Sequence, residues 1–499
     1  MRVADVLDRI ETSNPRRRGE YFEAFVQNLL KQHFERIGKT YVPQFRDGGL
    51  MLDGYVTDGI EDVDGPVGFE IMYVRYYATP SIMISQRLLK MNAASEKFGL
   101  RKWVVVAPFM HENVKKKILA SISPSVMIWG EKKLNELICE DEKRARAIVR
   151  NLFKLDLENE VNKQEDWKTA REKTLASMRE AYAKGKVSMV LGAGVSCSAG
   201  LPDWSMLLKS IYASFIGRVF RNENFSDKEL ADFTDMLMNA NDSSAIAMAQ
   251  YLKTGLSCED RKDTEFIQTV KEALYAHTEY RPSKLVEEIV DLCLSNDGKR
   301  RVKSVITYNF DNLMEKELEA KNVRCKAIYD ESGHYDVDEF PVYHVHGYLP
   351  NYAGIKSGES LIFSEEDYHK VYADAYHWSN LIQLVTFREC DCIMIGLSMS
   401  DPNLRRLLEI SSQKCAGKNR HFVFLKRLSE KQLTVGKSSQ SIDMVDKILR
   451  IHHTVQEMML KRLDVSVIWY NDYDDIPVLL EQIKDVNVVG DNLTLQCSM

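Results

Sequence analysis

Long apolar runs are absent from the sequence: no stretch of about twenty apolar residues could span a bilayer. Residues 1–18 also lack the apolar core of a signal peptide. The nine cysteines are scattered and none stands in a Cys-x-x-Cys pair, so neither a structural zinc site nor a disulfide framework is expected. The formal net charge of −6 provides no general attraction for nucleic acid. These absences predict a cytoplasmic protein with no membrane contact.

The length and composition predict a multidomain globular protein. A chain of 499 residues is too long for one ordinary core, and 44% hydrophobic with 28% charged residues is typical of globular proteins. We expect a small α/β domain over 1–155, a helical linker over 156–186 and a third region over 187–499. The predicted strands lie at 50–56, 67–74, 103–107, 126–129, 187–191, 302–307, 341–345, 392–395, 421–425 and 465–470.

The third region alternates strands with helices, which predicts a parallel, doubly wound sheet. A long helical insertion, roughly 205–298, separates its first two strands. Such a sheet binds ligands in a crevice at the carboxyl ends of its strands. Side chains that directly follow these strands are therefore the first candidates for a functional site.

A glycine turn, Gly192-Ala193-Gly194, follows the apolar strand 187–191 and precedes a run of small residues. This order would present bare backbone N–H groups and a helix N-terminus to a phosphate. The third glycine of the dinucleotide fingerprint G-x-G-x-x-G is replaced by Cys197, which we expect to be a small buried residue rather than a reactive thiol. Tight packing of the turn is the alternative explanation for its glycines.

Polar residues follow three other predicted strands. They are Thr307-Tyr308-Asn309-Phe310-Asp311, His344-Val345-His346-Gly347 and Gly396-Leu397-Ser398. Because the carboxyl ends of parallel strands lie at one edge of a sheet, we expect these segments to converge on the glycine turn.

Taken in order, these motifs resemble those of the sirtuin (silent information regulator) family. They are Gly-Ala-Gly-x-Ser, Gly-x-Pro-x-Trp, Thr-x-Asn-x-Asp, His-Gly and Gly-x-Ser, spread over 187–425. The resemblance implies a Rossmann-like domain that binds NAD+ and breaks the bond between nicotinamide and ribose.

The resemblance also implies roles for individual residues. Asn309 and Asp311 would hold the nicotinamide ribose and its water, and His346 would be the general base. His344 would then be structural, because the glycine after His346 lets a ligand approach that imidazole. The implied NAD+-binding residues are Gly192, Ala193, Gly194, Ser196, Pro202, Asp203, Trp204, Thr307, Gly396 and Ser398.

Plainer explanations exist for three of these segments. Asn309 and Asp311 could form only a turn and a helix cap, and Ser398 could only cap the helix that follows it. Asp401-Pro402 is more typical of a helix start than of a ligand contact.

The sequence departs from the deacetylases of the sirtuin family. Those enzymes carry a zinc module with two Cys-x-x-Cys pairs, which helps to form the acyl-peptide groove, and this chain has none. Without that groove, water is the natural acceptor, so we expect ADP-ribose and nicotinamide as products and no zinc. The pattern resembles sirtuin-like NAD+ glycohydrolases of bacterial anti-phage defence, which implies activation by infection or a partner. The resemblance further implies a homo-oligomer, with a phage-derived activator or a partner ATPase.

The first region resembles Mrr-type restriction endonucleases. The likeness rests on Glu20, Glu23, the Asp47-Gly48-Gly49 and Asp53-Gly54 turns, Phe69-Glu70 and Val126–Gly130. Such nucleases hold a divalent metal with two acids and carry a nearby lysine, and Asp53 with Glu70 fits the acids. Met72 stands in the place of the lysine, and Arg75 is the nearest cation on the segment. A degenerate domain for assembly or nucleic-acid sensing, helped by Arg16–Arg18, is the alternative to an active nuclease.

The sequence therefore leads to three hypotheses. The first is an NAD+ glycohydrolase that acts in anti-phage defence. The second is a nuclease or nucleic-acid sensor whose sirtuin-like domain only binds an NAD-derived ligand. A protein-lysine deacylase is the third.

Overall fold

A computed structural model describes most of the chain, and its two compact units, Met1–Lys163 and Gln164–Met499, are treated separately. The residues outside the description are 14–17, 48–49, 61–62, 74–80, 111, 123–124, 162–165, 220–225, 227–228, 230–231, 233–235, 237–244, 257–263, 277–280, 295–299, 353–360, 375, 413–419, 430–441 and 485–499. Among the described residues, no helix is both long and apolar enough to cross a membrane.

The first unit is built on a mixed five-stranded sheet in the order β1-β4-β5-β6-β7. Its strands are β1 (Tyr41–Pro43), β4 (Gly54–Val56), β5 (Val67–Ile71), β6 (Lys102–Val106) and β7 (Val126–Trp129), with a separate pair β2 (Arg46–Asp47) and β3 (Leu50–Met51). β1, β4 and β5 pair antiparallel, whereas β5, β6 and β7 pair parallel. The helices are α1 (Val3–Ser13), α2 (Arg18–Arg36), α3 (Ser81–Phe98), α4 (Glu112–Ser121), α5 (Glu131–Glu140), α6 (Glu142–Arg150) and α7 (Leu152–Val161).

Helices cover both faces of this sheet, as the contacts of the β6 side chains show. Val104 and Val106 pack into a core with α1, α2, α5 and α6, whereas Trp103 and Val105 pack against α3 and α4. The alternation follows from the two-residue period of a strand, which sends successive side chains to opposite faces. A strand buried on both faces is expected to be a continuous apolar run, as this one is.

The second unit contains a seven-stranded, fully parallel sheet in the order β10-β11-β9-β8-β12-β13-β14. The strands are β8 (Val187–Leu191), β9 (Val302–Thr307), β10 (Cys325–Ile328), β11 (Phe340–His344), β12 (Asp391–Ile395), β13 (His421–Lys426) and β14 (Val465–Tyr470). The sheet confirms the predicted α/β class and is consistent with a Rossmann-like fold. After β11 the chain crosses to the far side of β8 to form β12, so the strand order reverses at β8 and β12. Ligand crevices of doubly wound sheets lie at such reversal points.

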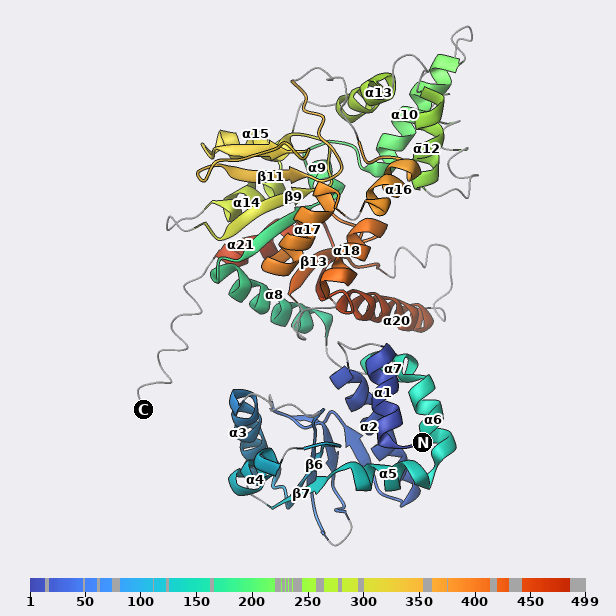
Figure 1. Cartoon of the computed structure of the whole chain (residues 1–499), viewed down its shortest axis with the longest axis vertical. Helices are drawn as coiled ribbons and strands as arrows, with labels where there is room; N and C mark the ends of the chain where they lie inside the picture. The colour runs from blue at the N-terminus through green and yellow to red at the C-terminus, as the bar shows by residue number, and fades with distance from the viewer. Residues whose placement is uncertain are drawn as a thin grey trace. The chain divides into compact units, whose positions relative to one another are not determined.

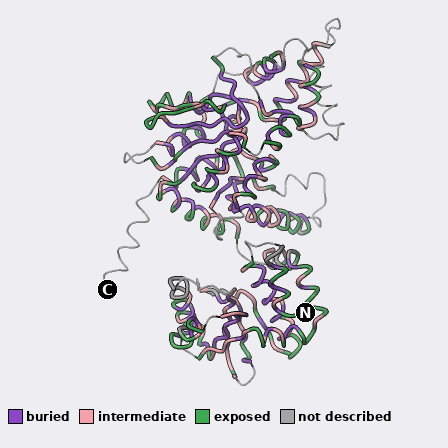
Figure 2. The backbone as a smooth tube through the Cα atoms, viewed as in Figure 1, coloured by how far each residue is buried: buried purple, intermediate pink, exposed green. Residues whose placement is uncertain are grey.

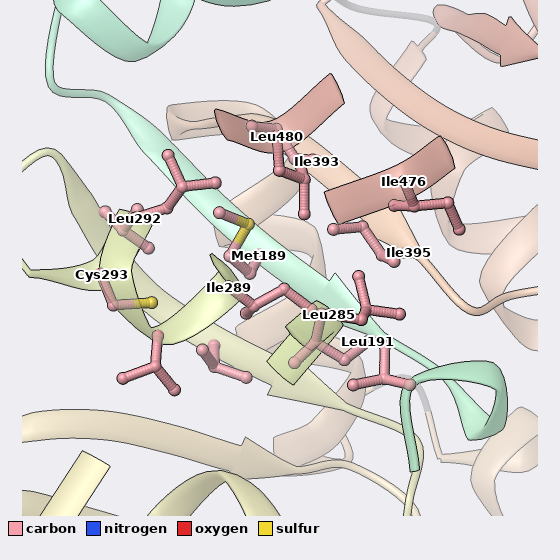
Figure 3. Close-up of a cluster of buried hydrophobic side chains, with 14 of the residues drawn as sticks. Met189, Leu191, Leu285, Ile289, Leu292, Cys293, Ile393, Ile395, Ile476 and Leu480 are labelled. Atoms are coloured by element: carbon pink, nitrogen blue, oxygen red, sulfur yellow. The ribbon is translucent and has the colours of Figure 1, made fainter. Parts of the chain in front are cut away.

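Helices cover both faces of this sheet (Figure 1). They are α8 (Trp167–Ala183), α9 (Ala193–Ser198), α14 (Lys284–Cys293), α15 (Leu313–Ala320), α17 (Trp378–Glu389), α18 (Pro402–Ser412), α20 (Ile442–Lys461) and α21 (Asp475–Lys484). Met189 and Leu191 of β8 face α14 and α21, with Leu285, Ile289 and Leu480 around them (Figure 3). Val190, between them in sequence, faces the layer of α17 and α18. Each such fully buried side chain contributes about 1.5–3 kcal/mol to stability.

The helices of the predicted insertion fall into two groups. α10 (Trp204–Val219), α12 (Ala245–Leu256) and α13 (Thr264–Tyr275) share a separate core with Phe363, next to α16 (Glu365–Ala373). α14, by contrast, packs in the core of the sheet and leads directly into β9. It is therefore a crossover helix of the sheet. Figure 2 shows buried residues concentrated along the strands, whereas buried and exposed residues alternate along the helices that cover the sheet.

The segment 156–186, predicted as a helical linker, contributes to both units. The end of α7 belongs to the first unit, where α7 packs on α2. α8 belongs to the second unit, where it packs on β14 and α21.

Candidate active site

The glycine turn lies against the turn that follows β12, at the reversal point of the sheet. A Cβ on Gly192 would lie 2.5 Å from the carbonyl oxygen of Gly396, and one on Gly194 would lie 2.8 Å from Gly396 Cα. Gly396 itself has φ +72°, a conformation that favours glycine. Side chains at these positions would push the two turns apart.

The backbone of the glycine turn differs from the expectation of bare N–H groups. Gly192 N–H donates to Ile395 O at 2.9 Å, and Gly194 N–H donates to Gly396 O at 3.0 Å. Those two donors are therefore used within the fold, since the neighbouring strand end lies close enough to accept them. The turn works first as a packing element that brings the ends of β8 and β12 together.

Asn309, after β9, lies directly on the glycine turn. Its side-chain Nδ2 donates to Gly192 O at 3.0 Å and to Ser196 Oγ at 2.8 Å. Ser196 Oγ in turn donates to Asp311 Oδ2 at 2.7 Å, and Asp311 Oδ1 accepts from Leu313 N–H at 3.1 Å. The structure thus brings three predicted site residues, Ser196, Asn309 and Asp311, into one hydrogen-bonded chain.

The carboxyl group of Asp311 is buried. Burial raises its pKa above the ordinary value, and the hydrogen bonds from Ser196 and Leu313 oppose that rise. Asp311 also caps the start of α15 through its bond to the Leu313 N–H, which fits the plainer interpretation of this residue. Its bond to Ser196 is additional to that capping role.

The His344 ring contacts the backbone carbonyl of Asn309. Its Nδ1 lies 3.1 Å from Asn309 O, and its Nε2 lies 2.6 Å from Glu315 Oε1 on α15. Burial acts to lower the pKa of His344, but Glu315 outweighs it and the pKa is raised. His344 and Glu315 are both buried, so this pair has the properties of a structural support.

His346 lies just beyond the end of β11 in an aromatic surrounding. The Tyr308 ring meets it edge-on at 4.6 Å between centroids, and the Tyr368 ring does so at 5.7 Å. Its Nε2 is buried without a hydrogen bond, 3.8 Å from Asp401 Oδ2. Burial lowers the pKa of His346 and Asp401 opposes that shift, so the imidazole is disposed to be neutral. A neutral imidazole can accept a proton.

The sequence did not point to Asp401, Tyr368 or Glu315 as part of this site. Asp401 begins α18 as predicted, because its Oδ1 accepts from Leu404 N–H at 2.7 Å. Its other oxygen, however, accepts from Tyr368 OH at 2.6 Å and faces His346. The carboxylate before Pro402 was the available signal, but its second role depends on a distant helix.

The remaining predicted NAD+-binding residues lie near the turn with varied exposure. Thr307 is buried and its Oγ1 accepts from Asn309 N–H at 3.1 Å. Ser398 is exposed and bonds to Ser400 Oγ at 2.6 Å, while Asp401 caps the helix that follows. Ala193 is half-buried.

The segment 202–204 leads into α10. Asp203 is exposed and its Oδ1 accepts from Met206 N–H at 2.8 Å, which caps that helix. Trp204 packs on Phe363 with ring centroids 4.5 Å apart, and Pro202 is half-buried. These contacts connect the turn to the separate helical core.

Cys197 is unsuited to be a nucleophile. Burial, with Asp203 and Asp311 nearby, raises the pKa of its thiol to about 11. The thiol is therefore protonated at neutral pH, which fits a small packing residue.

In the first unit, the structure brings Asp53 and Glu70 together. Asp53 Oδ2 accepts from Ile71 N–H at 2.6 Å, and Glu70 pairs with Arg87 of α3. Burial, followed by the charge of Glu70, raises the pKa of Asp53 to about 7. Burial also raises the pKa of Glu70, which Arg87 opposes.

The cation next to these acids is Arg87 of α3. The nuclease pattern instead has a lysine on the same strand as the second acid. Met72 is buried among Leu88 and Met91, and Arg75, Arg16 and Arg17 lie outside the described residues. Among the residues that the structure describes, no group of three or more His, Cys, Asp or Glu side chains is arranged to hold a metal ion.

Part of the second unit is similar to known proteins. Residues 303–443 match the model of the SIR2-like domain. The chain is 22% identical over 316 residues to a protein named NAD(+) hydrolase ThsA from Enterococcus faecium. That alignment covers 61% of this chain and 56% of the relative, so the chain spans about half of the relative's length. Part of the second unit is therefore similar to the SIR2-like domain, and Asn309, Asp311 and His346 lie within the matched residues.

Proposed function

We propose that this chain is an NAD+ glycohydrolase, which cleaves NAD+ to ADP-ribose and nicotinamide. One observation carries the proposal: the Asn309 amide is fixed on the glycine turn by Ser196 and Gly192, at the reversal point of a parallel sheet. His346 lies on the neighbouring strand end, where its ring contacts Tyr308, the residue before Asn309. The SIR2-like match and the name of the relative support the same substrate.

The chemistry suits these groups. Cleavage of the nicotinamide–ribose bond develops positive charge on the ribose, so a water held by an amide can attack as the bond breaks. His346, which burial keeps disposed to be neutral, would take the proton of that water. General-base catalysis of this kind contributes about 10²–10⁴ in rate.

Hydrolysis is favoured over deacylation by the cysteine pattern. The chain has no Cys-x-x-Cys pair from which to build the zinc module of the sirtuin deacetylases. With no zinc-supported groove for an acyl-lysine peptide, water is the acceptor in this proposal and zinc is not required.

We further propose that the enzyme acts in the cytoplasm as an abortive-infection effector in anti-phage defence. The resemblance to sirtuin-like defence enzymes supports this role. Unregulated hydrolysis would empty the host of NAD+, so an inactive resting state released by a phage-derived activator, by homo-oligomerisation or by a partner ATPase is part of the proposal.

Incubation of the purified chain with NAD+ tests the reaction. Nicotinamide and ADP-ribose should appear in equal amounts, and Asn309→Ala and His346→Ala should abolish both. Asn471→Ala and His452→Ala change the same residue types at exposed positions of the second unit and should leave activity unchanged. An Asn309→Ala protein as active as the unsubstituted chain would show that the mechanism is wrong. Release of O-acyl-ADP-ribose from an acyl-lysine peptide would support a deacylase instead.

A second candidate function concerns the first unit, where Asp53 and Glu70 lie together. In this alternative the unit cleaves or senses nucleic acid, with a divalent metal if it cleaves, and the SIR2-like domain only binds an NAD-derived ligand. It predicts metal-dependent DNA cleavage, or DNA binding, that is lost in Asp53→Ala and Glu70→Ala while NAD+ stays intact.

A further inference from the structure

The ring of His346 is enclosed by groups from three different elements. Tyr308 follows β9, Tyr368 lies on α16, and Asp401 precedes α18. Among the described residues, these are the titratable groups that face the imidazole. Burial raises the pKa of both tyrosines, so neither ring is charged at neutral pH.

One nitrogen of the His346 ring lacks a hydrogen-bond partner among the described residues. His346 Nε2 is buried and makes no hydrogen bond within the described structure, and a buried polar atom left in that state is destabilising. Asp401 Oδ2 faces it at 3.8 Å, which is outside the hydrogen-bonding range. The nitrogen and the carboxylate thus face each other but do not form a hydrogen bond.

A second donor reaches the same carboxylate oxygen. Tyr368 OH donates to the same Asp401 Oδ2 at 2.6 Å, whereas Asp401 Oδ1 is held by the Leu404 N–H at 2.7 Å. Asp401 Oδ1 is therefore bound at the start of α18. Asp401 Oδ2 lies between the Tyr368 hydroxyl and the His346 ring.

We propose that Asp401 is the positioning residue for His346, and that Tyr368 competes with the imidazole for the same carboxylate oxygen. This inference rests on the proposed NAD+ hydrolysis for its consequence. A carboxylate opposite Nε2 favours the tautomer that carries its proton there, which leaves the lone pair of Nδ1 free. Nδ1 then takes a proton from water, the water oxygen bonds to the anomeric carbon, and nicotinamide leaves neutral with the electrons of the broken C–N bond. His346 afterwards returns the proton to solvent.

Two substitutions separate this role from a merely structural one. Asp401→Asn removes the charge but keeps the helix cap, because asparagine caps helices as well as aspartate does. Tyr368→Phe removes only the competing hydroxyl. Glu366→Gln, which removes an exposed carboxylate from the same helix as Tyr368, is the matched control.

The readout is the titration of His346 by NMR of the histidine ring signals in the full chain, with the signal assigned by its loss in His346→Gln. Asp401→Asn should lower the midpoint by about one pH unit, since a carboxylate at this distance favours the imidazolium. Tyr368→Phe should raise the midpoint, and Glu366→Gln should leave it in place. The ring nitrogen shifts should show less of the Nε2–H tautomer in Asp401→Asn.

An unmoved midpoint in Asp401→Asn, or a midpoint lowered by Tyr368→Phe, would overturn the proposal. If the Asp401→Asn chain does not fold, Tyr368→Phe alone decides it by the direction of the shift. These titrations need no turnover, so their failure is distinct from failure of the proposed function. Where turnover is measured, Asp401→Asn should lower kcat and move the acid limb of its pH profile downward, because a weaker base is neutral at lower pH.

Discussion

Asn309 Nδ2 lies 2.8 Å from Ser196 Oγ, and this one contact joins the end of β9 to the helix that follows the glycine turn. Ser196 passes the hydrogen bond on to the buried Asp311 at 2.7 Å. The amide that we expect to hold the attacking water is therefore fixed by a residue 113 positions earlier in the chain.

Ser196→Ala should impair both catalysis and stability. It removes one of the two acceptors of the Asn309 amide and leaves a buried Asp311 oxygen without its donor. A buried polar group that loses its hydrogen-bond partner costs about 1–3 kcal/mol, so we expect a loss of that size in the free energy of unfolding and a fall in kcat. Denaturant unfolding and nicotinamide release measure the two effects. The exposed Ser198→Ala is a matched control on the same helix, and an equal loss there would contradict this explanation.

Glu315→Gln should lower the free energy of unfolding most at pH values below the ordinary histidine pKa of 6.5, and it should slow the reaction. The folded-state pKa of His344 is raised above its ordinary value, so the pair contributes stability that is present below the unfolded pKa and is lost as pH rises through the folded pKa. The substitution should lower the pKa of His344 and reduce that pH-dependent contribution. Stability curves between about pH 5 and 8 test this.

Glu319→Gln, one turn along α15 and exposed, is the control for that experiment. It should leave both the stability profile and kcat in place. A Glu315→Gln chain with an unchanged kcat would show that the His344–Glu315 pair does not support Asn309.

Gly396→Ala should lower the free energy of unfolding by much more than the cost of the positive φ alone. The added Cβ would lie 2.6 Å from Val195 N and 2.8 Å from Gly192 O, in addition to the cost of φ +72°. Gly185 has a similar φ of +67°, but its Cβ would meet nothing nearer than 3.9 Å. We expect Gly185→Ala to cost about 1 kcal/mol and Gly396→Ala several times more, with loss of activity. Similar costs for both would mean that the two turns are not closely packed.

Asp53→Asn should stabilise the first unit at alkaline pH. The pKa of Asp53 is raised from 3.8 to about 7, so its contribution is full below the unfolded value and is lost as pH rises through about 7. Asparagine stays neutral and can still accept from the Ile71 N–H. At pH 8 we expect a gain of about 2–4 kcal/mol in the free energy of unfolding, with little difference at pH 4. Thermal unfolding of the two proteins at both values tests the direction, and a gain at pH 4 alone would contradict it.

The sequence predicted six of the seven strands in the sheet of the second unit, because those buried strands are rich in apolar residues. It missed β10, a short edge strand that includes Lys326. The segment 302–307 forms β9 over the same residues, and Asn309 and Asp311 follow it at the reversal point. The chain order of the motifs sufficed to predict that the end of β9 meets the glycine turn, because parallel strand ends lie at one edge.

The partners of that site could not be predicted from local pattern. Tyr368 reaches Asp401 across 33 positions, and Glu315 reaches His344 across 29. Each contact depends on how a helix packs against the sheet. The occupied N–H groups of Gly192 and Gly194 likewise depend on how closely Gly396 approaches, which spacing in the sequence does not reveal.

The most direct test of the central claim is the NAD+ content of cells that express the chain, measured with and without phage infection. We expect NAD+ to fall, and nicotinamide and ADP-ribose to rise, in infected cells with the unsubstituted chain. With Asn309→Ala at equal expression, NAD+ should stay at the level of uninfected cells. An equal fall in both strains, or no fall in either, would contradict NAD+ hydrolysis at this site.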